Sequence, residues 1–205
     1  MAANGHQTPS PTIVLASSSR YRAQLLSRYF PRFSTVSAPI DESAHGGEVP
    51  QSLALRLAAA KAEHVANQQP DSIIIGCDQV AALQDGGTSR LLGKPGGRDQ
   101  AFEQLIQMSG KTVYFYTACC VMDTRDNSRT TFCDPYQIVI RPLSPALIDA
   151  YLAREQPYDC SASIKSEGLG GALIAAHHGT DPATLIGLPL IKLLDALASL
   201  GLHPL

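Results

Sequence analysis

The chain has 205 residues, of which 44% are hydrophobic, and a formal net charge of −2. This length allows one domain with a sizeable core, and the near-neutral charge excludes a globally basic surface that would bind nucleic acid or membranes. The five cysteines lack C-x-x-C spacing, which argues against a disulfide framework or a zinc site and predicts a cytoplasmic protein. Residues 1–12 are polar and lack an apolar run, so we predict a disordered tail rather than a signal peptide.

The first candidate site follows the first predicted strand. Residues 13–16, IVLA, form a short apolar run that predicts a buried strand, and three serines and Arg20-Tyr21-Arg22 then lead into a helical pattern. A helix N-terminus after a serine-rich turn offers free backbone N–H groups to an anion. Arginines in the first helical turn are poorly placed unless a negative ligand is bound. An N-cap serine beside two solvent-exposed arginines is an equally good interpretation of these residues alone.

Acidic and basic residues recur near the next predicted elements. Residues 33–37 alternate like a strand, and Asp41-Glu42 follow it as either a functional pair or a solvated turn. Residues 50–67 predict a helix, which carries Lys61 in an alanine-rich stretch. The face expected to be buried is formed by Leu53, Leu57, Ala60 and His64, and it is widened by Leu55 and Ala58–Ala59. Lys61 is either a surface lysine or one that emerges toward an anion.

The strongest predicted strand covers residues 72–76 and is apolar throughout, so we expect it to be central. Asp78 follows it directly, and an acid at the end of a buried strand tends to point into a ligand-binding crevice. Residues 85–89 predict a turn. Lys94 lies in the loop GKPGG, whose proline and glycines restrict the backbone. A turn lysine in water is the alternative for Lys94.

The second half continues the alternation of strand and helix. We predict a helix over 99–108, strands over 112–122 and 136–141 joined by a hairpin turn at Asp126-Asn127, and a helix from Ser144 through Tyr151. The glycine- and serine-rich residues 160–171, with Lys165 and Glu167, predict a functional loop. His177-His178 is predicted as a turn, and residues 184–200 as the final helix.

Carboxylates and cations from separate segments form a recognisable chemical set. Three cations and two carboxylates near a helix N-terminus are suited to metal-assisted phosphoryl chemistry, because the cations neutralise phosphate charge and a carboxylate activates or holds water. The sequence contains no Walker A, G-x-S-x-G, H-E-x-x-H or G-x-G-x-x-G motif that would support another chemistry.

These residues resemble the Maf family of nucleotide pyrophosphatases. The motifs LASSSRYR, Asp41-Glu42, Lys61-Ala62, GCDQV and GKP occur in the order and spacing of that family, and the resemblance covers residues 13–205. It implies a single α/β domain with a twisted mixed β-sheet flanked by helices, two lobes around a central cleft, and often a homodimer. It also implies cleavage of a nucleoside triphosphate into a monophosphate and pyrophosphate with magnesium or manganese.

The resemblance further implies a role for each matching residue. Asp78 is the expected proton acceptor and, with Glu42, the expected metal ligand. The expected ligands of the phosphates are Ser17, Arg22, Lys61 and Lys94, of which the last three also act in catalysis. The remaining expected substrate-binding residues are Tyr21, Gln79, Lys165 and Glu167. Arg20 stands where the family usually has proline, which bears on the rigidity of the serine turn.

The loop CSASIKSEG, the stretch GLPL and the closing HPL resemble the 7-methyl-GTP pyrophosphatase branch. N7-methylguanine is cationic and would stack on an aromatic face such as that of Tyr21. Its N–H donors suit the carboxylate of Glu167, which would repel a pyrimidine carbonyl. We therefore predict hydrolysis of 7-methyl-GTP. The alternatives are a dTTP, UTP or broader nucleotide pyrophosphatase and a nucleotide-binding regulator of cell division, acting in septum formation without turnover.

Overall fold

The computed structural model describes residues 11–85 and 88–205. Most of the predicted tail and the centre of the turn predicted over 85–89 lie outside the described residues. Thr12, which we assigned to the tail, already belongs to the first strand. No helix within the described ranges is long and apolar enough to cross a membrane.

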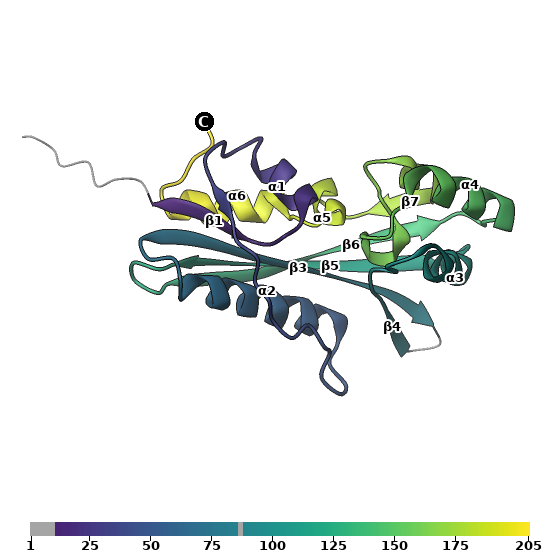
Figure 1. Cartoon of the computed structure of the whole chain (residues 1–205), viewed down its shortest axis with the longest axis horizontal. Helices are drawn as coiled ribbons and strands as arrows, with labels where there is room; N and C mark the ends of the chain where they lie inside the picture. The colour runs from purple at the N-terminus through teal and green to yellow at the C-terminus, as the bar shows by residue number, and fades with distance from the viewer. Residues whose placement is uncertain (1–10, 86–87) are drawn as a thin grey trace, which may run out of the picture.

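Within the described residues, seven strands form one mixed sheet in the order β2-β1-β3-β5-β6-β7, with β4 also paired to β3 (Figure 1). β1 runs parallel to β2 and β3, and the other neighbours are antiparallel. This arrangement confirms the predicted mixed sheet. The strands are β1 Thr12–Ala16, β2 Ser34–Thr35, β3 Ser72–Asp85, β4 Thr88–Leu92, β5 Thr112–Asp123, β6 Arg129–Ile140 and β7 Ile174–His178.

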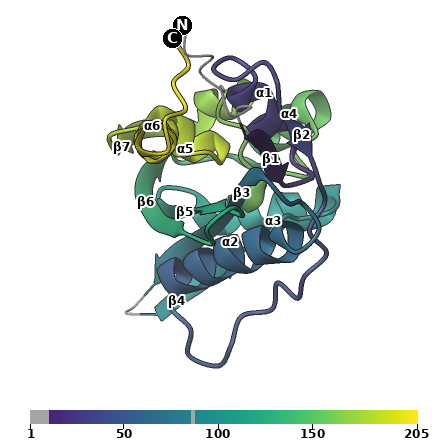
Figure 2. The ribbon, with the colours of Figure 1, turned by 90° about the vertical axis from the view of Figure 1, so that its left-hand side faces the viewer.

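Helices cover both faces of this sheet. Figure 2 shows α2 on one side of β3 and β5, with α5 and α6 on the other side. The α-helices are α1 Arg20–Leu26, α2 Pro50–Ala66, α3 Arg98–Met108, α4 Pro145–Glu155, α5 Pro182–Ile186 and α6 Leu190–Ser199. Two 3₁₀ turns, η1 Ser161–Ser163 and η2 Leu169–Leu173, lie in the loop that the glycines and serines predicted.

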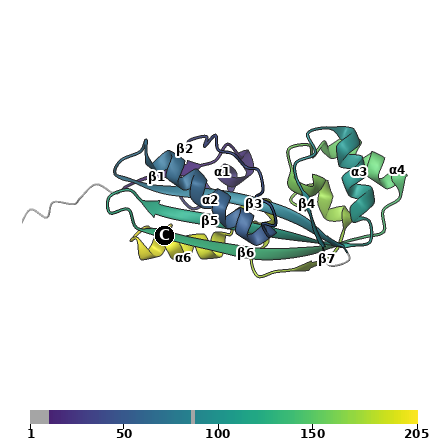
Figure 3. The ribbon, with the colours of Figure 1, turned by 90° about the horizontal axis from the view of Figure 1, so that it is seen from below.

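The hydrophobic cores lie toward the two ends of the long strands. One core packs α3, α4 and β4 around Leu83, Phe115 and Ile138. At the other end, α2 packs on one face of β1 and β3, and α1 and α6 pack on the opposite face. Figure 3 shows these two groups of elements joined by β3, β5 and β6. The fold therefore has two lobes that share strands, as the resemblance implied.

The packing of α2 on β3 depends on Gly76. A Cβ at this position would lie 2.6 Å from the backbone nitrogen of Ala62 and would overlap the carbonyl oxygen of Ala58. Glycine thus allows the helix backbone to approach the strand closely. The buried stripe of the helix runs through Leu57, Lys61 and Val65.

This packing corrects the helix face predicted from the sequence. Ala60 and His64 are only half-buried, whereas Lys61 is buried. The close contact at Gly76 selects the stripe containing Ala58 and Ala62, because these small side chains allow the nearest approach. Lys61 is therefore carried toward the sheet rather than toward water.

Several predicted boundaries were wrong for identifiable reasons. β3 continues to Asp85, so Asp78 lies within a long strand rather than after its end. β6 begins at Arg129 rather than 136, and β2 has two residues instead of five. Polar residues are typical of strand ends, but a strand shared by two lobes can carry them where the hydrophobic cores separate.

The C-terminal region differs from the prediction in two ways. His177 and His178 belong to β7, which pairs with β6, rather than to a turn. The predicted final helix is divided into α5 and α6. Gly187 ends α5 with a φ of 116°, a conformation that favours glycine, and Pro189 caps the start of α6.

Candidate functional site

The candidate site lies where the edge of β3 is open. β1 pairs with β3 as far as Gly76, and β4 pairs with the same edge from Ala81 onward. Among the described strands, none pairs with residues 77–80 on this edge. A cavity of about 390 Å³ opens there and is lined by residues of both lobes. Asp78 and Gln79 lie in the middle of this opening, and both line the cavity.

Two carboxylates and a lysine meet inside the cavity. The Nζ atom of Lys61 lies 2.6 Å from Oδ1 of Asp78 and 2.6 Å from Oε1 of Glu42. The Lys61 and Asp78 side chains are 11% and 10% exposed, whereas Glu42, on the loop after β2, is 60% exposed. Partial burial opposes ionisation of Glu42, but the hydrogen bond and charge of Lys61 outweigh it, so its pKa lies below the ordinary value.

The serine turn is fastened to the sheet by Arg22. Ser19 caps α1 by accepting a hydrogen bond from the Arg22 backbone N–H. The Arg22 guanidinium donates to the carbonyl oxygens of Gly187 and Cys77, both at 2.8 Å, and to Ser17 Oγ at 3.3 Å. Arg22 is therefore held inside the site, whereas the neighbouring Arg20 is exposed. The interpretation of Arg22 as a solvated arginine is wrong.

Lys94 completes the cationic lining. It lies on the loop between β4 and α3 and lines the cavity with Ser17 and Arg22. Its positive charge adds to that of Lys61 in lowering the pKa of Glu42. The loop turns at Gly96, with a φ of 72°, and the Gly96 N–H donates to Tyr158 O at 3.0 Å. Lys94 is thus presented by a restrained backbone.

The donor chemistry of this cavity fits a hard divalent cation. Asp78 and Glu42 supply carboxylate oxygens, and magnesium is commonly bound by one or two carboxylates together with substrate phosphates and waters. Among the described residues, no group of three or more His, Cys, Asp or Glu side chains is placed to hold a metal. A cation would therefore need oxygen ligands from a phosphate substrate and water to complete its coordination.

A second cavity of about 410 Å³ adjoins the first. Arg22, Gln79 and Lys94 line both. The walls of the second cavity come from Arg20 and Tyr21 on α1, from the loop carrying Asp159, Cys160 and Glu167, and from Leu185 and Ile186 on α5. Burial raises the pKa of the Cys160 thiol to about 12, so this thiol carries no charge near neutral pH. A charged compartment thus leads into one with aromatic, apolar and acidic walls.

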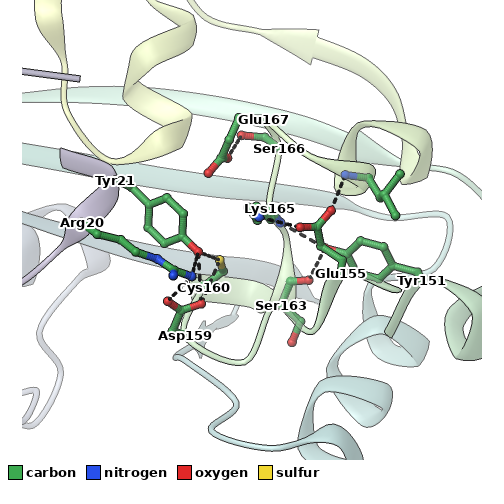
Figure 4. A network of polar contacts seen from close by, with 11 residues as sticks. Arg20, Tyr21, Tyr151, Glu155, Asp159, Cys160, Ser163, Lys165, Ser166 and Glu167 are labelled. Atoms are coloured by element: carbon green, nitrogen blue, oxygen red, sulfur yellow. Dashed lines mark hydrogen bonds and ion pairs between the residues drawn. The ribbon is translucent and has the colours of Figure 1, made fainter. Parts of the chain in front are cut away.

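Tyr21 lies in a polar network in the second cavity (Figure 4). Arg20 Nη2 donates to Tyr21 Oη at 2.8 Å and contacts Asp159 Oδ2 at 3.4 Å. The guanidinium carbon of Arg20 lies 4.8 Å from the centroid of the Tyr21 ring. The planar guanidinium of Arg20 therefore lies over the Tyr21 ring, which is the arrangement expected of a cation–π site.

Lys165 is the sequence-predicted site residue that lines neither cavity. Its Nζ donates to Glu155 Oε1 at 2.6 Å, and Glu155 Oε2 accepts from the Leu169 N–H at 2.6 Å (Figure 4). Tyr151 accepts from the Lys165 N–H and donates to Ser163 O, both at 3.1 Å. These contacts fasten the loop to α4, and Glu167 on the same loop does line the second cavity.

Sequence reasoning missed Asp159, Thr117 and Thr184. Asp159 immediately precedes the loop predicted from residue 160, and a boundary one residue earlier would have included it. Thr117 and Thr184 are fully buried, on β5 and α5. They contact Gln79 from elements distant in sequence, and no local pattern marks them.

The mixed sheet and the cation-lined opening define an α/β protein with a site for a polyanion next to an aromatic compartment. The sequence matches the family described as Maf-like protein over residues 12–200, and the chain belongs to this family.

Three known proteins are similar to this chain to different degrees. The 7-methyl-GTP pyrophosphatase of Methylobacillus flagellatus is 51% identical, over 93% of this chain and 97% of the relative. The 7-methyl-GTP pyrophosphatase of Alcanivorax borkumensis is 47% identical, over 95% and 96%. Among solved structures, the Staphylococcus aureus Ham1 protein is 16% identical with a TM-score of 0.46, over 64% of this chain and 72% of that one.

Arg20 stands where the Maf family usually has proline, and its position in α1 predicts the effect of restoring that proline. Arg20 is the first residue of α1, where proline is favoured, and Ser19 before it has the extended ψ of 113° that precedes proline well. We expect Arg20→Pro to leave the melting temperature equal or to raise it by roughly 1–4 °C. Arg20→Ala is the control that removes the side chain alone. A clear fall in melting temperature for Arg20→Pro relative to Arg20→Ala would contradict this account of the turn.

Proposed function

We propose that this protein hydrolyses 7-methyl-GTP to 7-methyl-GMP and pyrophosphate. The observation that carries the proposal is the Asp78–Lys61–Glu42 cluster in a cavity that adjoins a second one lined by Tyr21 and Glu167. The two compartments match the two halves of a nucleotide, a triphosphate and a base. The relatives with 45–51% identity that carry the name 7-methyl-GTP pyrophosphatase support the same substrate.

In the proposed reaction Arg22, Lys94 and Lys61 bind the triphosphate oxygens and take up the charge that develops on the leaving group. Ser17 and the N-terminus of α1 add neutral donors. Asp78 accepts a proton from the attacking water. The new bond forms between water oxygen and the α-phosphorus, and the α–β bridging P–O bond breaks, so that its electron pair leaves with pyrophosphate.

Asp78 and Glu42 would hold a divalent cation, which when bound would supply additional neutralisation of phosphate charge. At the other end of the substrate, the Tyr21 ring stacks on the cationic base, and the Glu167 carboxylate accepts hydrogen bonds from the guanine edge. Lys165 acts through its ion pair with Glu155, which holds the loop that presents Glu167.

A panel of nucleoside triphosphates tests this proposal. Pyrophosphate release is measured with 7-methyl-GTP, GTP, UTP and dTTP, with magnesium or manganese and again with excess chelator. We expect the highest kcat/KM for 7-methyl-GTP and the loss of release in chelator. A preference for UTP or dTTP would favour the broader nucleotide pyrophosphatase, and tight binding without release would favour the regulator of cell division.

Glu167→Gln should change the base preference without stopping bond cleavage. The substitution removes the charge and adds an NH₂ donor, so it weakens the contact with guanine donors by roughly 1–3 kcal/mol and favours a pyrimidine carbonyl. We expect the ratio of kcat/KM for 7-methyl-GTP over UTP to fall by about 5- to 150-fold. Glu63→Gln, on the exposed surface of α2, is the matched control. An unchanged ratio in Glu167→Gln would mean that this residue does not read the base.

A further inference from the structure

The amide of Gln79 is held in one orientation by three acceptors. Its Nε2 donates to Thr117 Oγ1 at 3.0 Å, to Thr184 O at 2.9 Å and to Leu185 O at 3.2 Å. The Thr117 hydroxyl donates its only proton to Thr184 O, at 2.9 Å, so it can only accept from Gln79. Reversing the amide would direct its oxygen at two carbonyl oxygens. The amide nitrogen therefore faces α5, and Oε1 takes no part in these contacts.

The buried carboxylate of Asp134 contacts Thr184, one of the residues that hold the Gln79 amide. Asp134, on β6, is 4% exposed, and its Oδ2 accepts from Thr184 Oγ1 at 2.7 Å. Its Oδ1 lies 2.7 Å from Lys192 Nζ on α6, which also donates to Cys133 O at 2.8 Å. A buried carboxylate with both oxygens engaged is a strong restraint on its partners, because each would leave a buried polar group unsatisfied if it moved.

The contacts form a chain from Lys192 through Asp134 and Thr184 to Gln79. Gln79 lines both cavities, whereas none of the other three residues of this chain of contacts lines either one. The chain ties together β6, α5, α6 and β3 at the place where the two cavities meet. Its effect on a ligand can therefore pass through Gln79 and through Leu185 and Ile186, at the end of α5, which line the second cavity.

We propose that Asp134 and Thr184 are positioning residues that hold Gln79 with its carbonyl oxygen toward the substrate. The site then accepts a hydrogen-bond donor at this point and disfavours an acceptor. A guanine edge, with its ring N–H and amino group, satisfies this requirement, whereas the carbonyl edge of uracil or thymine does not. This inference rests on the proposed function and adds a source of base selection that is independent of Glu167.

The test compares Thr184→Val, which removes the hydroxyl, with Thr184→Ser, which keeps it. For Thr184→Val we expect KM for 7-methyl-GTP to rise about 5- to 30-fold with kcat changed less than about 3-fold. The ratio of kcat/KM for 7-methyl-GTP over UTP should fall about 5- to 30-fold, and Thr184→Ser should stay within about 3-fold of the original protein. Thr117→Val, a nearly isosteric change on β5, should shift the ratio in the same direction and serves if Thr184→Val does not fold.

A double-mutant cycle separates positioning from general loosening of the structure. In a Gln79→Ala background, Thr184→Val and Thr117→Val should leave the nucleotide ratio unchanged, because the group they position is gone. The same fall in the ratio with and without Gln79 would overturn the inference, as would an unchanged ratio in a folded Thr184→Val protein.

Calorimetry measures the binding affinities of 7-methyl-GTP and UTP and so gives the corresponding nucleotide ratio without turnover. A chain that binds both nucleotides but releases no pyrophosphate would refute the proposed reaction, and its binding ratio in the variants would still decide the role of Thr184. Normal turnover with an unchanged ratio would refute the positioning role alone.

Discussion

Asp78→Asn is expected to abolish nearly all pyrophosphate release while leaving the protein folded. Asp78 lies in the open edge of β3 and shares Lys61 with Glu42. Its side chain is 10% exposed against 60% for Glu42, so it is the more buried of these two carboxylates. Loss of a general base lowers rates by roughly 10²- to 10⁴-fold, and weakened cation binding adds to the loss. Asparagine retains an oxygen that can accept from Lys61, which is why we expect the packing of α2 on β3 to survive.

The measurement is kcat for 7-methyl-GTP at saturating magnesium, with circular dichroism to confirm folding. Asp99→Asn is the matched control, because that side chain is 93% exposed and lines neither cavity. A folded Asp78→Asn protein that keeps most of its rate at saturating magnesium would remove Asp78 from the proposed chemistry.

Arg22→Lys is expected to lower both substrate binding and rate, with kcat/KM falling by about 10²- to 10³-fold. The guanidinium uses Nε and Nη1 on the carbonyl oxygens of Gly187 and Cys77, a two-point attachment that a single ammonium cannot reproduce. The second result should be a loss of stability of about 1–3 kcal/mol, because a buried carbonyl is left without its donor.

The stability part is measured by chemical denaturation and the catalytic part by steady-state kinetics. Arg28→Lys, in the turn that follows α1 and exposed, controls for a general effect of the substitution. Wild-type kinetics in Arg22→Lys would mean that the guanidinium is a structural clasp between β3 and the Gly187 turn and that it does not bind phosphate.

The sequence determined the features that depend on local patterns. Apolar runs and spacing were sufficient for β1, α2, α3 and β5, and the serine cap at the start of α1 follows from residue type. The segments that carry Ser17, Arg22, Glu42, Lys61, Asp78 and Lys94 were recognisable from residue type and from the motifs shared with the Maf family. The structure brings all of these residues to one cavity.

Tertiary structure alone decided which of these groups touch. Helical periodicity places Lys61 on a helix, but the close approach at Gly76 selects the face that meets Asp78. Lys165 and Glu167 are two residues apart in one loop, yet Glu155 on α4 engages the lysine and leaves the glutamate to line the cavity. The buried chain from Asp134 to Gln79 joins residues 55 positions apart through Thr184, 50 positions beyond Asp134. Such contacts depend on competition among distant partners for each polar group, which local sequence patterns do not encode.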